Sequence, residues 1–157
     1  FEDKAVRTEG GEFSADMILF MPGMTGPAWM QGSPLPASPG GMIQADEMTA
    51  VEGMERVFVA GDAGSYPGPD WMPKQAHMAD LQATAAAKNI ALNLVGKAAS
   101  EKFKVELMCI IDSLDQGILI YRVEKRGLAL PAMKPLHWAK RSFESTYLRH
   151  FRNAGKS

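Results

Sequence analysis

Cysteine is almost absent from this 157-residue sequence, which contains only Cys109. One cysteine excludes an internal disulfide and a cysteine-based zinc site, and it favours a cytoplasmic location. The three histidines, His77, His137 and His150, are not spaced like metal ligands, so we predict no metal site. No apolar run has the length of a membrane span, and no stretch has the pattern of a signal peptide.

The length suits one ordinary domain, or a domain with a tail. The sequence starts with Phe1 rather than Met, and the residues after it have neither an initiation nor a targeting character. We therefore expect this chain to be a piece of a longer protein.

The formal net charge is only −1, but the charged residues are unevenly distributed along the chain. The chain up to Tyr121 carries 8 Lys and Arg against 16 Asp and Glu, whereas the part from Arg122 onward carries 9 against 2. This acidic body and basic tail predict an anionic surface or partner for the tail. No recognisable nucleic-acid-binding module accompanies the basic residues, so we do not predict nucleic acid binding.

Apolar runs and turn residues predict an α/β fold in the first part of the chain. An apolar run ended by Pro22 predicts a buried strand, and Gly, Pro and Ser predict a long loop after it. A second apolar run, Val-Phe-Val-Ala, predicts another buried strand. The expected elements are strands at 15–21, 42–45 and 57–60, and loops at 22–42 and 61–73.

Residues 75–95 have the spacing of one long helix, with Gly96 as its C-terminal stop. Small apolar residues recur on one face, which predicts close packing of that face against a sheet or another backbone. The expected face is formed by Ala76, Ala79, Ala83, Ala86, Ala87, Ile90, Ala91 and Leu94.

Two β-rich runs, 103–111 and 117–123, predict a hairpin with its turn at 112–116. Prolines at 131–135 are expected to break the chain before a final helix at 136–151. The last helix carries Leu136, Phe143, Tyr147 and Phe151 on one stripe, with basic residues around it. We therefore divide the chain into residues 1–98 and residues 99–157.

The pair Gly61-Asp62 follows the expected strand at 57–60, and Pro73-Lys74 opens the long helix. In open α/β sheets ligands bind at the carboxyl ends of strands. Glycine lets a ligand approach the backbone closely, an ionised carboxylate accepts from two hydroxyls, and a helix N-terminus offers free N–H groups. Alone, Gly-Asp could simply turn the chain, but the helix that follows favours a ligand site.

The run from Val57 to Asp62 resembles the second flavin-binding motif of the FAD-dependent pyridine nucleotide-disulfide oxidoreductases. The run from Pro73 to Ile90 is similar to the helix that follows that motif. Sulfide:quinone oxidoreductases and flavocytochrome c sulfide dehydrogenases are the most similar branch, with type II NADH dehydrogenases next. The resemblance covers about residues 14–95 and implies the C-terminal portion of an FAD-binding Rossmann-like domain, followed by a small hairpin and helix region.

Carried over by position, the resemblance implies FAD as cofactor. Asp62 would bind its ribityl chain and Gly61 would let it approach. Backbone N–H groups near Lys74, Gln75 and Ala76 would face the pyrimidine edge of the flavin ring. A helix N-terminus stabilises negative charge on a reduced flavin, which agrees with this placement.

Two departures from the family pattern matter. The expected threonine before the motif is missing, because Val51 and Glu52 occupy that region. No G-x-G-x-x-G occurs in the sequence, so this chain has no predicted site for the adenosine half of FAD. We expect the isolated chain to be inactive and not to retain flavin.

Three further residues, Cys109, Lys74 and His77, are considered for a role at the site. In the resembled family a cysteine pair reacts with sulfide, but Cys109 is single and lies in an apolar run, which favours a structural role over a catalytic one. Lys74 is either an electrostatic partner of the flavin or an ordinary solvated lysine. His77, one turn into the helix, is interpreted as structural.

The basic tail also has two interpretations. Residues 134–156 resemble the amphipathic segments by which quinone-reducing members sit on anionic membranes, which would place the protein peripherally at the inner membrane. The alternative, which we favour, is that the aromatic stripe packs on its own domain or on a second copy in a homodimer.

Three functions remain open from the sequence. The first is a flavoenzyme that passes electrons from sulfide to a quinone or another acceptor, of which this chain supplies the ribityl and pyrimidine contacts. The second is a type II NADH dehydrogenase. The third is a non-catalytic interaction module that keeps the fold without flavin.

Overall fold

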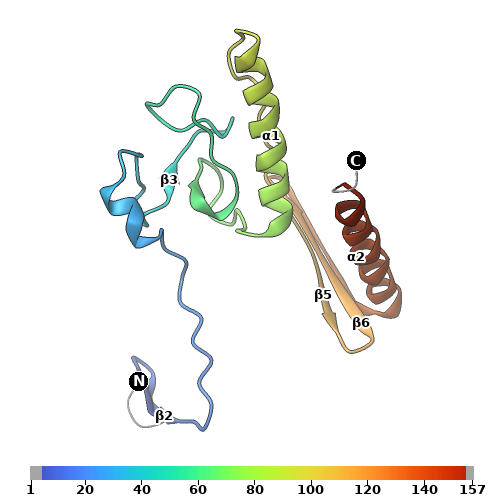
Figure 1. Ribbon diagram of the computed structural model, residues 1–157. Coiled ribbons are helices and arrows are strands. Elements are labelled where there is room, and N and C mark those ends of the chain that lie inside the picture. Colours follow the sequence, from blue (N-terminus) through green and yellow to red (C-terminus); the bar gives the residue numbers. More distant parts are fainter. Residues whose placement is uncertain (1–4, 155–157) are drawn as a thin grey trace.

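The computed structural model describes residues 5–154, without the side chain of Gln31. The outermost residues of the two expected parts, 1–4 and 155–157, lie outside the described residues, including the end of the 134–156 segment. Figure 1 shows a central body formed by loops and a long helix, a slender sheet with a second helix beside it, and an N-terminal hairpin at the end of an extended segment.

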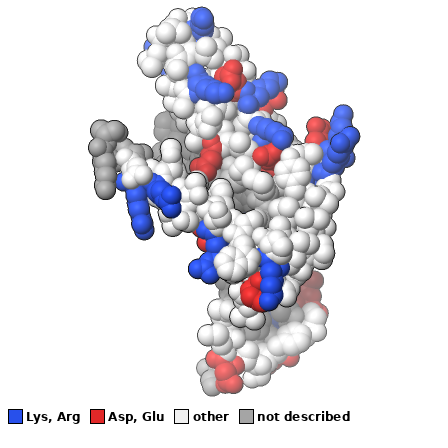
Figure 2. Space-filling view, turned by 90° about the vertical axis from the view of Figure 1, so that its right-hand side faces the viewer, with Lys and Arg blue, Asp and Glu red and all other residues white. Residues whose placement is uncertain are grey.

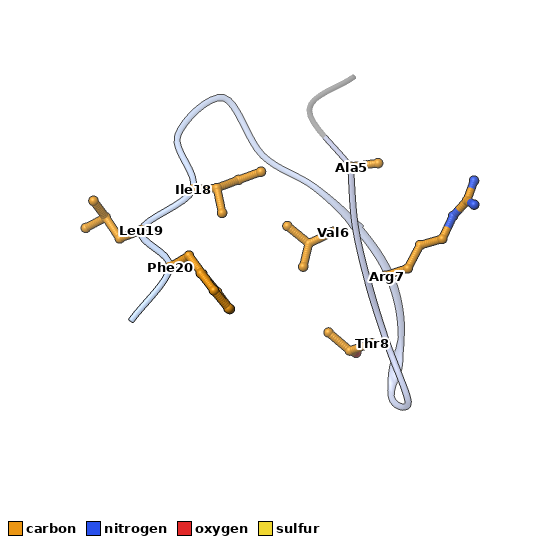
Figure 3. Close-up of a pocket in the computed structure, with 7 residues that line it drawn as sticks. All are labelled: Ala5, Val6, Arg7, Thr8, Ile18, Leu19 and Phe20. Carbon is orange, nitrogen blue, oxygen red and sulfur yellow. The ribbon is translucent and has the colours of Figure 1, made fainter. Parts of the chain in front are cut away.

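The N-terminal hairpin pairs β1 (Ala5–Thr8) with β2 (Gly11–Ser14) in antiparallel fashion. The strand expected at 15–21 is wrong: this segment forms no regular structure and is largely exposed, with Met21 91% accessible. A buried strand needs a neighbour, and no strand of the described chain pairs with it. Part of it instead curls back beside β1, where Val6, Ile18 and Phe20 point into a shallow hollow (Figure 3).

The central body is built mainly from loops. It contains the 3-10 helix η1 (Ala28–Gly32) and the two-residue strands β3 (Ile43–Gln44) and β4 (Gly64–Ser65), which pair in parallel. The short strand expected at 42–45 is therefore confirmed in a shorter form, but it is not an edge, because Ile43 also forms a bridge with Ala37 on its other side. The first core cluster lies here and consists of Met30, Ile43, Ala45, Val51 and Val59.

The expected strand at 57–60 is also wrong as a regular strand. Phe58 forms a single bridge with Ala50, and Val59 donates its N–H to the Thr49 carbonyl at 3.0 Å. The stretch that it faces contains left-handed residues at Thr49, Gly53 and Arg56, which turn the backbone and prevent a continuous ladder. The segment is still extended, and Val59 is still buried.

The long helix α1 (Ala76–Leu94) is confirmed, and Gly96 follows it in a left-handed conformation as expected. Its buried face differs from the predicted one. The inward residues are Met78, Gln82, Ala85, Ala86 and Asn89, whereas most of the expected alanine face, with Ile90 and Leu94, is exposed. Gln82 and Asn89 determine the buried face because each forms hydrogen bonds to backbone that α1 covers.

The second core cluster joins α1 to the strand region. It consists of Met78, Ala85 and Phe103, with Tyr66 packed against it and against the first cluster. Beyond it lies an antiparallel sheet of three strands, β5 (Glu106–Ser113), β6 (Gln116–Val123) and β7 (Arg126–Met133), in the order β5-β6-β7. The hairpin is therefore confirmed, with a tighter turn at Leu114 and Asp115.

The third strand β7 was not expected, because Pro131 lies within it. Proline is tolerated there because β7 is at the edge of the sheet, and a bulge between Gly117 and Leu119 disrupts the ladder nearby. The expected break at 131–135 is accordingly a strand that leads directly into the second helix, α2 (Lys134–Ala154).

The first turn of α2 lies close against the sheet at Gly117. A Cβ on Gly117 would be 2.9 Å from the His137 backbone nitrogen, and the His137 ring pairs with Asp112 at 2.8 Å. The rings of Phe143, Tyr147 and Phe151 contact one another along α2, but Phe143 and Phe151 are exposed. The expected stripe thus exists, and within the described chain little covers it.

Candidate functional site

Gly61 begins the short 3-10 helix η2 (Gly61–Ala63) at the end of the extended segment. Its φ is +74°, a conformation that favours glycine. A Cβ at this position would lie 3.4 Å from the Ala79 Cβ, and the Gly61 N–H donates to the Gln82 Oε1 at 2.9 Å. The turn can therefore lie directly against α1 because residue 61 is glycine.

Asp62 follows on the exposed side of this turn. Among the described residues its carboxylate has no hydrogen-bond or ion-pair partner, although its backbone carbonyl accepts from Lys74. Burial, reinforced by the charge of Asp62, raises the pKa of the nearby Tyr66 phenol. The carboxylate is thus free to accept hydrogen bonds from ligand hydroxyls.

Lys74 contacts the backbone of the η2 turn. Its ammonium donates to the carbonyls of Asp62 and Gly64 at 3.0 Å each. These bonds tie the start of α1 to the η2 turn and stabilise the loop between them. The ammonium group is therefore held at the turn, although the Lys74 side chain remains exposed to solvent.

The N-terminus of α1 is uncapped. Gln75 occupies the N-cap position without a side-chain cap, the first turn has no acidic residue, and the first helical bond runs from the Ala79 N–H to the Gln75 carbonyl. The N–H groups of the residues between them point out of the helix end, where the helix dipole is positive. The Gln75 amide instead donates to the Met108 carbonyl of β5 at 3.4 Å.

A groove of roughly 270 Å³ lies beside the η2 turn. Of the predicted site residues, Gly61, Asp62 and Lys74 line it, whereas Gln75 and Ala76 do not. Tyr66, Met78 and Gln82 also line the groove and were not identified from the sequence. A polar Gln82 among the alanines of α1 was the one available signal.

Cys109 lies in β5 opposite Ile120, half-buried, and does not line the groove. Among residues 5–154 no group of three or more His, Cys, Asp or Glu side chains could hold a metal ion. No helix in the same range is long and apolar enough to cross a membrane.

His77 anchors the first turn of α1 to the sheet, in agreement with its structural interpretation. Its Nε2 lies 2.8 Å from a carboxylate oxygen of Glu106, whose side chain is 12% exposed. Lys104 pairs with the other oxygen at 2.5 Å, and the Tyr121 hydroxyl donates to that oxygen at 3.4 Å. Hydrogen bonds from Lys104 and then His77 lower the pKa of Glu106 below its ordinary value of 4.5.

This lowered pKa predicts that the contribution of Glu106 to the stability of the fold depends on pH. A carboxyl whose pKa is lower in the folded state stabilises the fold above its unfolded pKa, and this contribution is lost as pH falls through the folded pKa. We expect the free energy of unfolding to fall below about pH 4.5 by less in Glu106→Gln than in the parent chain. Urea unfolding at several pH values measures this, with the exposed Glu55→Gln as control; identical pH profiles for Glu106→Gln and the parent would contradict it.

No protein-family model matches this chain. Among solved structures, the chain is similar to the sulfide:quinone oxidoreductase from the hyperthermophilic bacterium Aquifex aeolicus, with a TM-score of 0.77 and 22% sequence identity. The match covers 95% of this chain and 38% of that protein. This chain has the fold of part of a sulfide:quinone oxidoreductase. The predicted α/β class is therefore confirmed, and the chain spans well under half the length of the protein that it matches.

Proposed function

We propose that this chain is part of an FAD-dependent oxidoreductase that passes electrons from sulfide to a quinone, and that it supplies the ribityl and pyrimidine contacts of the flavin. The observation that carries the proposal is the free Asp62 carboxylate beside Gly61, close to the uncapped start of α1. The fold shared with part of a sulfide:quinone oxidoreductase supports it.

The residues of the site fit a flavin. The Asp62 carboxylate can accept from ribityl hydroxyls, and the missing side chain at Gly61 permits close approach to the backbone. The N–H groups at the start of α1 can donate to an electron-rich ring edge, where the helix dipole favours negative charge. When bound, the flavin would accept an electron pair from the donor and pass it to the acceptor.

The remainder of a longer polypeptide is the proposed partner for two exposed apolar surfaces. One is the outer face of α1, which includes Ile90 and Leu94, and the other is the extended segment with Met17, Leu19 and Met21. Exposed apolar area of this kind marks a contact surface. Under this proposal the remainder of the polypeptide would also bind the adenosine half of FAD, so we expect the isolated chain to lose flavin during gel filtration; flavin absorbance that stays with it would contradict this.

The test of the proposed function uses the longer polypeptide that contains this chain. We expect it to purify yellow and its flavin absorbance to bleach on addition of sulfide under anaerobic conditions. Bleaching by NADH but not by sulfide would favour the type II NADH dehydrogenase. A colourless protein would contradict the proposal and favour a non-catalytic interaction module.

We propose a second contact, between α2 and an anionic membrane surface at the cytoplasmic side of the inner membrane, because the packing on its own domain that the sequence favoured leaves Phe143 and Phe151 exposed. Lys140, Arg141, Arg149 and Arg152 accompany Trp138 and Phe143 on this helix. Figure 2 shows the side of the molecule on which α2 lies, where Lys and Arg form separate groups and several of these adjoin Asp or Glu. Basic residues next to exposed aromatic rings are typical of helices that lie on membranes.

We therefore expect this chain to co-sediment with phosphatidylserine vesicles at low salt and to dissociate as salt is raised. Reversing the charges with Arg149→Glu and Arg152→Glu should weaken binding by about 30-fold or more, because each basic residue near the surface contributes about 1 kcal/mol and each new carboxylate is repelled. Lys88→Glu on α1 is the matched control. No co-sedimentation at low salt would favour packing of the stripe on protein, and a dimer in ultracentrifugation would identify a second copy as the partner.

A further inference from the structure

Side chains from outside the η2 turn hold its backbone on both sides of Asp62. The Gln82 Oε1 accepts the Gly61 N–H at 2.9 Å. Lys74 donates to the carbonyls of Asp62 and Gly64. Since these bonds engage only backbone groups, they restrict the turn without occupying the Asp62 carboxylate.

The Tyr66 hydroxyl completes this arrangement. It lies 3.1 Å from the Val59 carbonyl oxygen and 3.4 Å from the Gly61 carbonyl oxygen, so its single proton is shared between the two or alternates between them. These carbonyls lie on either side of the point where the extended segment bends into η2. One phenol thus connects the end of the extended segment to the left-handed residue.

The Tyr66 ring is closely packed by its neighbours. It packs against both core clusters and meets Phe103 edge to face at 5.2 Å. A Cβ on Gly64 would be 2.1 Å from the Tyr66 hydroxyl oxygen, so the ring occupies this position only because residue 64 is glycine. Burial of the ring, with Asp62 nearby, keeps the phenol protonated and therefore able to donate.

We infer that Tyr66 is a positioning residue, whose hydroxyl presets the left-handed conformation of Gly61 and thereby directs Asp62 into the groove. The expected gain in ligand affinity at Asp62 rests on the proposed flavin site. The effect of Tyr66 on the conformation of Gly61 does not depend on that proposal. A preset turn improves affinity because its conformational entropy is not lost on binding.

Two variants of this chain test the inference in different ways. Tyr66→Phe keeps the ring and removes the hydroxyl, and Gly64→Ala keeps the hydroxyl but displaces it. Tyr121→Phe removes a phenol hydroxyl that donates to Glu106 instead, and it serves as the control. The first readout is the three-bond coupling between the amide and α protons of Gly61, which reports its φ. The second is the affinity for flavin mononucleotide, measured by quenching of flavin fluorescence.

In both test variants we expect the Gly61 coupling to move toward the average of a free glycine and the flavin affinity to fall about tenfold, the value of one lost hydrogen bond. The control should change neither. A Gly61 coupling that stays at the parent value in both variants would overturn the inference, as would unchanged flavin affinity in Tyr66→Phe. If the parent chain binds flavin mononucleotide too weakly to measure, the Gly61 coupling alone decides the role of Tyr66, and the flavin proposal is decided separately, by the colour and sulfide bleaching of the longer polypeptide. If one variant does not fold, the other decides.

Discussion

Replacing Asn89 with alanine should lower the free energy of unfolding by about 3–4 kcal/mol, since several buried polar groups lose their partner at once. Asn89 is fully buried on α1 and uses its whole amide. Its Nδ2 donates to the carbonyls of Met48 and Glu101 at 2.8 Å, and its Oδ1 accepts from the N–H groups of Ser100 and Glu101 at 2.9 Å. One side chain thus connects α1 to two loop segments that contain no helix or sheet of their own.

The matched control is Asn93→Ala, one turn further along the same helix. Asn93 donates one exposed hydrogen bond, to the Lys97 carbonyl at 3.0 Å, so its loss should cost less than about 1 kcal/mol. Asn89→Asp is a second variant: it keeps both acceptor bonds, loses both donors and buries a charge, and it should be about as damaging as alanine. Urea unfolding followed by circular dichroism measures all three. Equal losses for Asn89→Ala and Asn93→Ala would contradict the central structural role of Asn89.

The second large effect is expected in flavin retention. In the longer polypeptide, Asp62→Ala should weaken FAD binding about 100-fold, because hydrogen bonds to a charged group contribute about 1.5–3 kcal/mol and two hydroxyls lose their acceptor. The ratio of flavin absorbance to protein absorbance after dialysis measures this loss. The fold should not change, because the Asp62 carboxylate has no partner among the described residues.

Asp70→Ala is the control for this experiment. Asp70 lines the same groove and is also exposed, but it is not part of the η2 turn. We expect it to keep its flavin. Equal flavin contents for Asp62→Ala and the parent protein, or equal losses in the two variants, would contradict a specific role for Asp62.

The sequence predicted those elements that depend on local signals. The bounds of α1 follow from alanine content and a C-terminal glycine, and the hairpin follows from its β-branched runs. The face of α1 could not be predicted in the same way. Periodicity selected the alanines, but hydrogen bonds of Gln82 and Asn89 to distant backbone place a different side of the helix inward. Such partners are 21 and 41 residues away in the sequence.

Only part of the candidate site could be predicted from the sequence. Gly61 and Asp62 carry a local motif, so they could be identified from sequence. The side chains of Tyr66 and Gln82 form hydrogen bonds with backbone groups at or next to the turn, and no local sequence pattern predicts these bonds. The expected strands at 15–21 and 57–60 failed for a related reason: apolar runs do not show whether a pairing strand is present.

The most direct test of the flavin site is a titration of the ¹⁵N-labelled chain with flavin mononucleotide, and in parallel with adenosine diphosphate, followed by amide chemical shifts. Flavin mononucleotide should bind weakly and shift the amides of Gly61 and Asp62 and those of Ala76 to Met78 at the start of α1. Adenosine diphosphate should leave them unchanged, because the sequence contains no predicted site for the adenosine half. Unchanged amides at these positions with flavin mononucleotide, or the same shifts with both ligands, would contradict the assignment of this turn and helix end as the flavin half of the site.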